Sequence, residues 1–307
     1  MSELDITVDG IVAAHAAIPP DMRGTPLLSL GELVLKDETA TPIGSFKGRG
    51  TAWYAHRHAA ATPLVVCASA GNFGQGLARA MAAEGARAIV YAAETANPMK
   101  LDRMRALGAE VVLAGRDFDA ANDAARAHAA REGLPFLEDA ALAEIAEGAG
   151  TIAKEMTEAG VEPDAVYVPV GGGALVNGIG TWLKAHAPRT RVIGVVAEGA
   201  PAAAASWRAG RAMPGEAVDT IADGIAIRAP VQAAVEVMRR VVDDFVTVSD
   251  AEIVAAMRWL RREAGIVAEP AGAAGVAAAR RDGEGRAASV ICGGNVAPDR
   301  REEWFGA

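Results

Sequence analysis

Short apolar runs rich in β-branched residues alternate with longer alanine-rich stretches along nearly the whole chain, and this alternation restricts the fold more than any other feature. The runs predicted to be strands are residues 33–36, 64–68, 88–92, 110–113, 165–169, 191–196, 244–248 and 288–292. The stretches predicted to be helices are residues 48–60, 74–83, 98–107, 118–131, 142–159, 174–187, 230–241, 250–264 and 270–281. Alternation on this scale is typical of βαβ units, so the sequence predicts parallel sheets with helices on both faces.

Two of these helices carry recognisable start signals. Ser249 precedes Asp250 and Glu252, which is typical of an N-cap followed by an acidic first turn. Pro270 suits the first position of a helix, where no N–H is needed. Glu269 either caps that helix or lies near a ligand, and the cap is the preferred interpretation.

The bulk composition excludes several classes of protein. Of the 307 residues, 51% are hydrophobic and 22% are charged, which indicates a soluble globular chain. The net charge is -9 and no basic stretch could follow a phosphate backbone, which argues against nucleic acid as a partner. Cys67 and Cys292 lie far apart and form no CxxC pair, so neither a disulfide framework nor a structural zinc site is expected.

The longest charge-free stretch, residues 165–183, is almost long enough to span a bilayer. Pro169, the glycines at 171–173 and Asn177 interrupt it, so we expect a strand, a turn and a helix instead. The N-terminus reads MSELDITVDG, which is acidic where a signal peptide would be basic and then apolar. We therefore expect no membrane partner and a cytoplasmic location.

Three turns carry residues suited to chemistry, and the first is TPIGSFKGRG with Lys47 at its centre. This turn follows a predicted strand and opens a predicted helix. A lysine desolvated between apolar elements, beside Phe46, would favour its neutral and nucleophilic amine. On this segment alone, an ordinary surface lysine on a glycine-rich turn is the preferred interpretation.

The second turn is CASAGNFGQG, residues 67–76, where a strand runs directly into a glycine-rich loop and a helix. Such a junction directs free backbone N–H groups at one point, which suits a carboxylate or a phosphate. Asn72 adds an amide side chain at the same place. Anion binding and simple tight packing remain equal alternatives for this segment.

The third turn is VPVGGGALVNG, residues 168–178. Three consecutive glycines cost backbone entropy, so the run indicates main chain that curls closely around a ligand, for which phosphate is the natural choice. The chain contains no GxGxxG fingerprint and no Gly-Lys dipeptide of a Walker A loop, so a nucleotide is not indicated. A phosphate cradle together with a reactive lysine instead suits pyridoxal phosphate.

With these motifs in order, the sequence resembles the fold type II pyridoxal-phosphate enzymes, and among them the serine/threonine dehydratases. The matching segments are GSFKGRG, SAGNFGQG, VGGGALVNGI, TIADGIA, EPAGAAG and ICGGN. The resemblance implies that Lys47 forms a Schiff base with the cofactor and serves as the catalytic base. It places the following residues at the cofactor: Phe46, Lys47, Asn72, Gly171, Gly172, Gly173, Ala174, Leu175 and Cys292. It places the following residues at the substrate carboxylate: Ser69, Ala70, Gly71 and Asn72.

Several residues depart from the family pattern. Ala174 replaces the fourth glycine of the phosphate loop and would be strained if its φ were unusual. Ala70 stands where the family's racemases carry a serine, which argues against racemisation. For the cation that some members bind, the chain offers Glu198 and Ala202, while Ala204 replaces the acidic residue. This pattern leaves open a monovalent cation held mainly by carbonyl groups.

Cys292 would face the pyridine nitrogen if the resemblance holds. A neutral thiol is a weak hydrogen-bond partner, which should disfavour a long-lived carbanion and favour prompt β-elimination. Without the resemblance, a buried small apolar residue at a strand end would be the preferred interpretation of Cys292. Asp223 lies in an Asp-Gly pair, for which a turn is the preferred role.

The resemblance implies two open, twisted α/β domains with mostly parallel sheets and the cofactor in the cleft between them. Residues 1–63 and 140–307 would form the larger domain and residues 64–139 the smaller one. The implied reaction is dehydration and deamination of a small hydroxy-amino acid, such as L-threonine or L-serine, to a 2-oxo acid and ammonia. The alternatives are β-replacement or threonine synthase-like chemistry, diaminopropionate ammonia-lyase activity, and cofactor binding without turnover. A homodimer is also implied.

Overall fold

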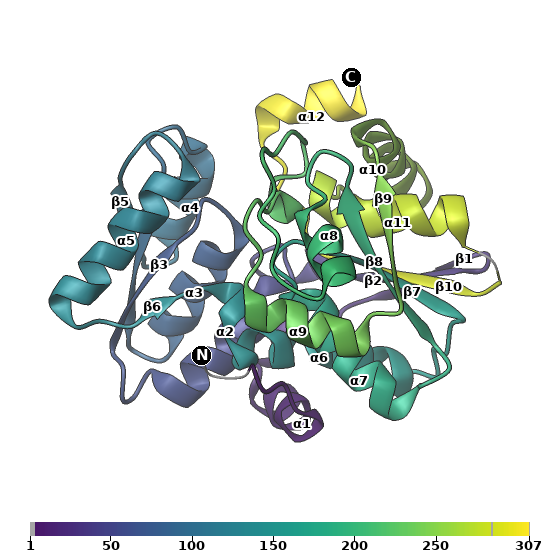
Figure 1. Ribbon diagram of the computed structural model, residues 1–307, viewed down its shortest axis with the longest axis horizontal. Coiled ribbons are helices and arrows are strands. Elements are labelled where there is room, and N and C mark those ends of the chain that lie inside the picture. The colour runs from purple at the N-terminus through teal and green to yellow at the C-terminus, as the bar shows by residue number, and fades with distance from the viewer. Residues whose placement is uncertain (1–3, 284, 307) are drawn as a thin grey trace.

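In the computed structural model, which describes residues 4–283 and 285–306, the strands form two separate sheets (Figure 1). A six-stranded sheet has the order β1-β2-β10-β7-β8-β9, and a four-stranded sheet has the order β5-β4-β3-β6. The strands are β1 (Leu27–Leu30), β2 (Leu33–Asp37), β3 (Leu64–Ala68), β4 (Arg87–Ala92), β5 (Glu110–Leu113), β6 (Phe136–Leu137), β7 (Ala165–Pro169), β8 (Arg191–Ala197), β9 (Asp244–Val248) and β10 (Ala287–Ile291). All pairings are parallel except that of β1 with β2.

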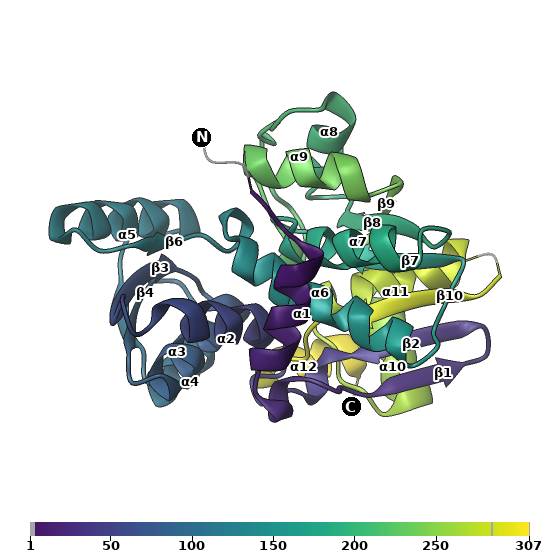
Figure 2. The same cartoon turned by 90° about the horizontal axis from the view of Figure 1, so that it is seen from below.

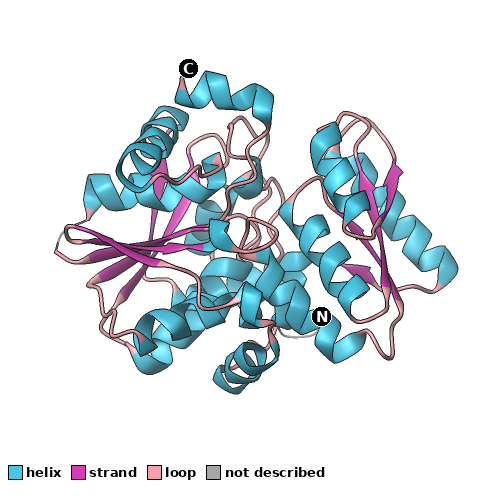
Figure 3. Ribbon diagram, turned by 180° about the vertical axis from the view of Figure 1, so that it is seen from behind, coloured by secondary structure: helices cyan, strands magenta, loops and turns pink. Residues whose placement is uncertain are grey.

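Helices surround both sheets, as Figure 3 shows for the two groups of strands. They are α1 (Val8–Ala17), α2 (Lys47–His58), α3 (Asn72–Ala83), α4 (Pro98–Ala106), α5 (Phe118–Glu132), α6 (Ala143–Glu158), α7 (Ala174–His186), α8 (Ala202–Ala209), α9 (Gln232–Val241), α10 (Asp250–Ala264), α11 (Pro270–Asp282) and α12 (Pro298–Phe305). We call the four-stranded sheet with α3, α4 and α5 the small lobe, and the six-stranded sheet with its helices the large lobe. Figure 2 shows α1 lying across α6 on the outside of the large lobe.

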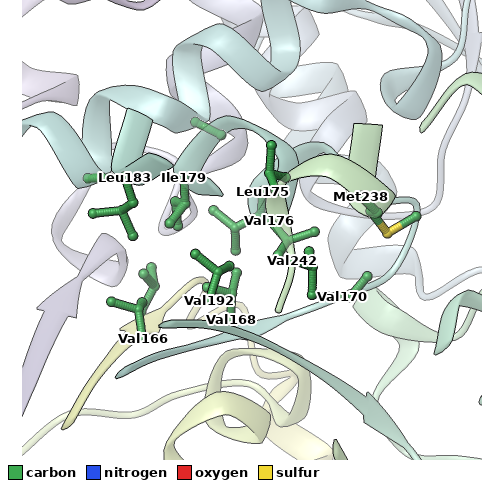
Figure 4. Close-up of a cluster of buried hydrophobic side chains, with 14 of the residues drawn as sticks. Val166, Val168, Val170, Leu175, Val176, Ile179, Leu183, Val192, Met238 and Val242 are labelled. Atoms are coloured by element: carbon green, nitrogen blue, oxygen red, sulfur yellow. The ribbon is translucent and has the colours of Figure 1, made fainter. Parts of the chain in front are cut away.

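The core of the large lobe follows from the alternation of side chains along its strands. Val166 and Val168 of β7 point to one face, where they join a cluster with residues of α7 and α9 (Figure 4). Ala165 and Tyr167 of the same strand point to the other face and pack against α10 and α11. Both faces of β7 are therefore buried, which explains why its sequence is apolar throughout.

The small lobe has the same layered construction. One face of its sheet packs against α3 and α4, and the other against α5. Tyr54 and Ala55 of α2, together with Ile145 of α6, also contribute to the first of these two cores. Helices α2 and α6 therefore pack against the small lobe and connect it to the large lobe.

The structure confirms every predicted strand and helix, with ends that differ by no more than two residues. Ser249 caps α10 in a capping box with Glu252, and Pro270 occupies the first turn of α11, both as predicted. The sequence analysis missed β1, β6, α1, α8 and α12. These elements are short or lie at the edge of the fold, where the hydrophobic pattern is weak.

The apolar stretch 165–183 forms β7, a glycine turn and most of α7, as predicted. Over the described part of the chain, no helix is both long and apolar enough to cross a membrane. The first three residues of the acidic N-terminal stretch lie outside the described residues.

Candidate active site

The chemically suited turns meet where strands of the two sheets end. The loop of residues 69–72 follows β3, the glycines at 171–173 follow β7, and Cys292 follows β10. Ligands of open α/β sheets bind beyond the carboxyl ends of parallel strands, so this is the expected place for a site. Lys47 reaches the same region as the first residue of α2.

The amine of Lys47 lies between an aromatic ring and a carboxylate. Its Nζ is 4.8 Å from the centre of the Phe46 ring. Lys47 Nζ also donates to Asp139 Oδ2 from the short 3-10 helix η3 (Asp139–Ala141). The Lys47 side chain is 17% exposed and that of Asp139 is 27% exposed, so both border a partly open space. The sequence analysis did not identify Asp139.

Main-chain bonds fix the Lys47 turn against the end of β10. The backbone N–H of Phe46 and the hydroxyl of Ser45 both donate to the carbonyl of Cys292, each at 3.1 Å. The thiol of Cys292 is buried and donates to the carbonyl of Ala271 at 3.6 Å. Burial raises the pKa of Cys292, and the nearby Glu269 carboxylate raises it further. Cys292 is therefore a neutral thiol beside the Lys47 turn.

The loop of residues 69–72 presents its backbone to open space. Ser69 Oγ accepts from the N–H of Gly71 at 3.2 Å and from the N–H of Gly74 at 3.0 Å, which orders the loop at the start of α3. A Cβ atom placed on Gly71 would meet no heavy atom within 4 Å. Ala70, Gly71 and Asn72 are half-buried. The hydroxyl hydrogen of Ser69 stays free to donate to an anion in front of the loop.

Asn72 belongs to a hydrogen-bonded cluster that joins α3 to the large lobe. Asn72 Nδ2 donates to Glu269 Oε1 at 2.7 Å, and Asn72 Oδ1 accepts from Asn295 Nδ2 at 2.7 Å. Arg103 of α4 donates to Asn295 Oδ1 at 2.5 Å. One N–H of the Asn72 amide remains for a ligand.

Glu269 was expected to cap α11, and this interpretation is wrong for its side chain. Glu269 occupies the N-cap position, but its carboxyl group makes no capping hydrogen bond and turns to Asn72 instead. Pro270 is the first helical residue, and its missing N–H does not prevent a cap, so the contact with Asn72 is what draws the carboxyl group away from the helix start. Burial and the Asp223 carboxylate raise the pKa of Glu269 to about 7, although Lys100 and Asn72 act in the opposite direction.

The glycine loop packs closely against its neighbours and leaves no room for side chains at its first two positions. A Cβ atom on Gly171 would lie 3.0 Å from the Gly224 carbonyl oxygen, and one on Gly172 would lie 2.8 Å from Ala140 Cβ. Gly173 has a φ of 105°, which an L side chain rarely adopts. Within the described residues, no side chain caps α7, so the N–H groups of its first turn face the cradle.

Ala174 begins α7, and no residue other than glycine has a positive φ in the described part of the chain. The strain considered for Ala174 is therefore absent. Leu175 follows in the helix and is buried in the main core. The residues present thus suit the phosphate of pyridoxal phosphate, with Lys47 available for its aldehyde.

Asp223 starts a 3-10 turn, as expected, and also bridges the two lobes. It lies 2.6 Å from Lys100 of α4. Burial lowers the pKa of Lys100, but the charge of Asp223, its hydrogen bond and Glu269 outweigh this effect and raise the pKa. The TIADG segment therefore provides a contact between the two lobes.

Glu198 and Ala202, which were considered as ligands of a cation, are poorly placed to bind one together. Glu198 is exposed, and the carbonyl of Ala202 accepts from Ser206 Oγ at 2.7 Å. No group of three or more His, Cys, Asp or Glu side chains in the described residues could hold a metal ion. A site made mainly of carbonyl groups is not tested by these observations and stays a prediction.

Four residues of the site were not predicted from the sequence: Asp139, Asn295, Lys100 and Arg103. Asp139 and Asn295 each follow a strand within four residues, at the edge where ligands bind, and this position could have identified them. Lys100 and Arg103 lie on α4, and only the approach of the two lobes brings them to the cleft.

The comparisons with known proteins agree with this geometry. A family model described as "Pyridoxal-phosphate dependent enzyme" matches residues 18–293. The L-threonine ammonia-lyase of Thermotoga maritima is 39% identical over 272 residues, which cover 87% of this chain and 68% of that protein. The catabolic L-threonine dehydratase TdcB of Staphylococcus aureus is 33% identical over 310 residues, which cover 95% of this chain and 89% of that protein.

Solved structures with the same fold include the processed form of threonine deaminase isoform 2 from Solanum lycopersicum. Its TM-score is 0.88 and its sequence identity is 27%, and the match covers 98% of this chain and 94% of that one. Maize serine racemase has a TM-score of 0.91 and 26% identity, with coverage of 97% and 96%. The predicted resemblance, fold class and cofactor class are confirmed. This chain belongs to the pyridoxal-phosphate-dependent enzymes and has the fold type II architecture.

Proposed function

We propose that the protein dehydrates and deaminates a small hydroxy-amino acid, with L-threonine first and L-serine second, to a 2-oxo acid and ammonia. The observation that carries this proposal is the position of the Lys47 amine, which donates to Asp139 beside Gly172 of the glycine cradle. Asn72 of the 69–72 loop lies against Gly293, next to the Cys292 carbonyl that holds the Lys47 turn. Relatives named L-threonine ammonia-lyase and L-threonine dehydratase, similar over most of the chain, support the same reaction.

Each part of the site has a distinct task in this proposal. When bound, pyridoxal phosphate supplies an electron sink for charge that develops at the substrate Cα. The main-chain N–H groups of residues 171–175 would hold its phosphate, and Phe46, Asn72 and Cys292 would contact its ring. Ser69, with the backbone of residues 70–72, fixes the substrate carboxylate. Lys47 would bond the cofactor covalently and, once released, would take the α-proton on its Nζ atom.

Ala70 supports elimination rather than racemisation. Racemisation needs a second group that can deliver a proton to the opposite face of Cα, and the methyl side chain of Ala70 has none. The fold is shared with maize serine racemase, so the fold alone does not decide between the reactions. The methyl side chain of Ala70 therefore supports elimination.

The direct test combines a spectrum with a product assay. Purified protein incubated with pyridoxal phosphate should acquire visible absorbance, and Lys47→Ala should lose the covalent bond and the activity. Lys184→Ala is the matched control, because Lys184 pairs with Asp243 on the outside of the large lobe. Retention of covalently bound cofactor by Lys47→Ala would refute the proposal.

An amino-acid screen separates the proposed reaction from its alternatives. Release of 2-oxo acid and ammonia from threonine or serine supports the dehydratase. Ammonia release from diaminopropionate alone would support a diaminopropionate ammonia-lyase. Product formation only with a second nucleophile would support β-replacement. Product formation only from a phosphorylated hydroxy-amino acid would support threonine synthase-like chemistry. Absorbance without turnover of any amino acid would indicate a cofactor-binding protein.

Three further expectations belong to the same proposal. We propose that residues 64–139 form the smaller domain and that residues 1–63 and 140–307 form the larger one. We propose a homodimer, which sedimentation would test, and a cytoplasmic location, which fractionation would test. A monovalent cation at Glu198 and Ala202 should raise the melting temperature in potassium relative to choline salts.

A further inference from the structure

Asp139 is the acidic group in contact with the Lys47 amine, and the proposed function gives it no role. Lys47 Nζ makes a single hydrogen bond to the described residues, and Asp139 Oδ2 accepts it. The two side chains also form an ion pair. In the proposed reaction, the lysine must first bond the cofactor and then move a proton. The group that holds its amine therefore affects the position of the Nζ atom after release.

The position of Lys47 at a helix start favours an acidic partner for its amine. Lys47 is the first residue of α2, where the helix dipole disfavours a positive charge. The first turn of α2 contains no acidic residue that could offset this effect. The ring face of Phe46 attracts the cation only on one side. Asp139 supplies the negative charge that the helix start lacks.

The backbone holds Asp139 firmly in this place. It lies two residues after the end of β6 and starts η3, where the N–H of Ala141 donates to the carbonyl of Glu138 at 2.9 Å. Ala140 is buried, and its Cβ would lie 2.8 Å from a Cβ on Gly172. Asp139 therefore lies at the junction of the two lobes, between the lysine and the phosphate cradle.

We propose that Asp139 is the positioning residue for Lys47, which holds the released amine in the orientation that takes the α-proton and gives it up again. This inference rests on the proposed role of Lys47. Lys47 Nζ accepts the proton as the Cα–H bond breaks, and the resulting ammonium is paired with the Asp139 carboxylate. The proton then passes to the departing β-hydroxyl as the Cβ–O bond breaks, so that one water leaves and Lys47 is neutral again.

Kinetics of the holoenzyme test this role. Asp139→Asn should lower kcat by about 100-fold with little change in KM, because a misplaced catalytic group costs rate rather than substrate binding. Substrate deuterated at Cα should show a larger isotope effect with the variant, since proton transfer becomes slower than the other steps. Asp139→Glu should restore part of kcat because it keeps the charge.

A second readout does not depend on turnover. In the cofactor-free protein, Lys47 should react about tenfold faster with an amine-labelling reagent after Asp139→Asn, because the charge-assisted hydrogen bond that occupies its amine is lost. Mass spectrometry of the labelled protein locates the modification. Asp21→Asn is the matched control, since it removes the partner of Arg79 from an ion pair of 2.7 Å outside the cleft.

The outcomes distinguish this inference from the proposed function. Unchanged kcat together with tighter cofactor binding in Asp139→Asn would overturn the inference. In that case, Asp139 would serve only as a counter-ion of Lys47 in the cofactor-free protein. Equal labelling of Lys47 in the wild type and in both Asp139 variants would also overturn it. Covalent cofactor on a Lys47→Ala protein would refute the proposed function itself, whatever the Asp139 variants do.

Discussion

Gly173 is the residue of the phosphate cradle whose backbone most clearly requires glycine. Its φ of 105° would strain an alanine, and a Cβ there would lie 3.2 Å from Met238 Cε. Gly173→Ala should therefore lower the stability by about 1–2 kcal/mol and lower the affinity for pyridoxal phosphate by at least about tenfold. Thermal unfolding and a cofactor titration measure the two effects.

Gly133 offers a control for the backbone strain alone. It ends α5 with a φ of 66°, and a Cβ there would meet nothing within 4 Å. Gly133→Ala should cost a similar amount of stability and leave cofactor affinity unchanged. Equal losses of affinity in the two variants would show that the cradle does not bind the phosphate.

Glu269 should make the stability of the protein fall as the pH rises from about 4.5 to about 7. Its pKa is raised from 4.5 to about 7 by burial and by Asp223, so the folded protein binds a proton more tightly than the unfolded chain. The stabilisation is complete below about pH 4.5 and is lost as the pH rises to about 7. The loss amounts to at most about 3 kcal/mol.

Glu269→Gln removes this titration and should flatten the dependence of unfolding free energy on pH. Denaturant unfolding of both proteins at about pH 5 and about pH 8 measures the difference. The variant should gain stability relative to wild type only at the higher pH. An identical slope in the two proteins would place the ionisation elsewhere in the Asn72 cluster.

Among the secondary-structure elements, α2 matters most for the site, because its orientation decides where Lys47 points. Arg49 lies two residues after Lys47, on a different side of the helix, and is fully buried. It pairs with Glu38 at 2.7 Å and with Glu155 of α6 at 2.6 Å. This pairing fixes α2 between β2 and α6.

Arg49→Met should destabilise the protein by about 3–5 kcal/mol, since it leaves the buried Glu38 carboxylate without its partner. Arg57→Met on the same helix is the control, because Arg57 is 47% exposed and lies 3.9 Å from Glu144. That change should cost less than about 1 kcal/mol. Denaturant unfolding compares the two, and equal losses would mean that Arg49 does not anchor α2.

The difference between predictable and unpredictable features is clearest at the level of elements. Strands such as β7, buried on both faces, carry a continuous apolar signal, so their positions could be predicted from the sequence. The two-residue strand β6 carries no such signal, and it was missed together with the Asp139 that follows it. Local patterns also marked the Ser249 cap, which depends only on neighbouring residues.

The site shows the same division. The three turns could be located because glycines and Lys47 mark them in the sequence. The partner of Lys47 lies 92 residues away, and the partner of Asn72 lies 197 residues away, so neither contact follows from local pattern. The turn of the Glu269 carboxyl away from its helix also depends on this tertiary contact, which explains why the predicted cap was wrong.

For the whole molecule, the important feature is how the small lobe contacts the large one across the cleft. Lys100 pairs with Asp223 at 2.6 Å, and Arg228 pairs with Asp119 at 2.6 Å. The second pair is largely exposed on both sides and should contribute little. Lys100 is only 14% exposed, so its pair should contribute more to holding the lobes together.

Lys100→Met should loosen the small lobe while keeping the packing of the side-chain stem. We expect faster hydrogen exchange in α4 and in residues 220–227, and cofactor dissociation faster by about tenfold, because the lobes open more often. Lys100 also holds the pKa of Glu269 down, so the variant should shift the Glu269 titration to higher pH. Lys154→Met is the control, since Lys154 pairs with Glu158 of α6 and lies over the Trp182 ring of α7, both within the large lobe. If exchange and cofactor release match those of the control, the Lys100–Asp223 pair does not hold the cleft closed, and movement of the lobes must be limited by the packing of α2 and α6.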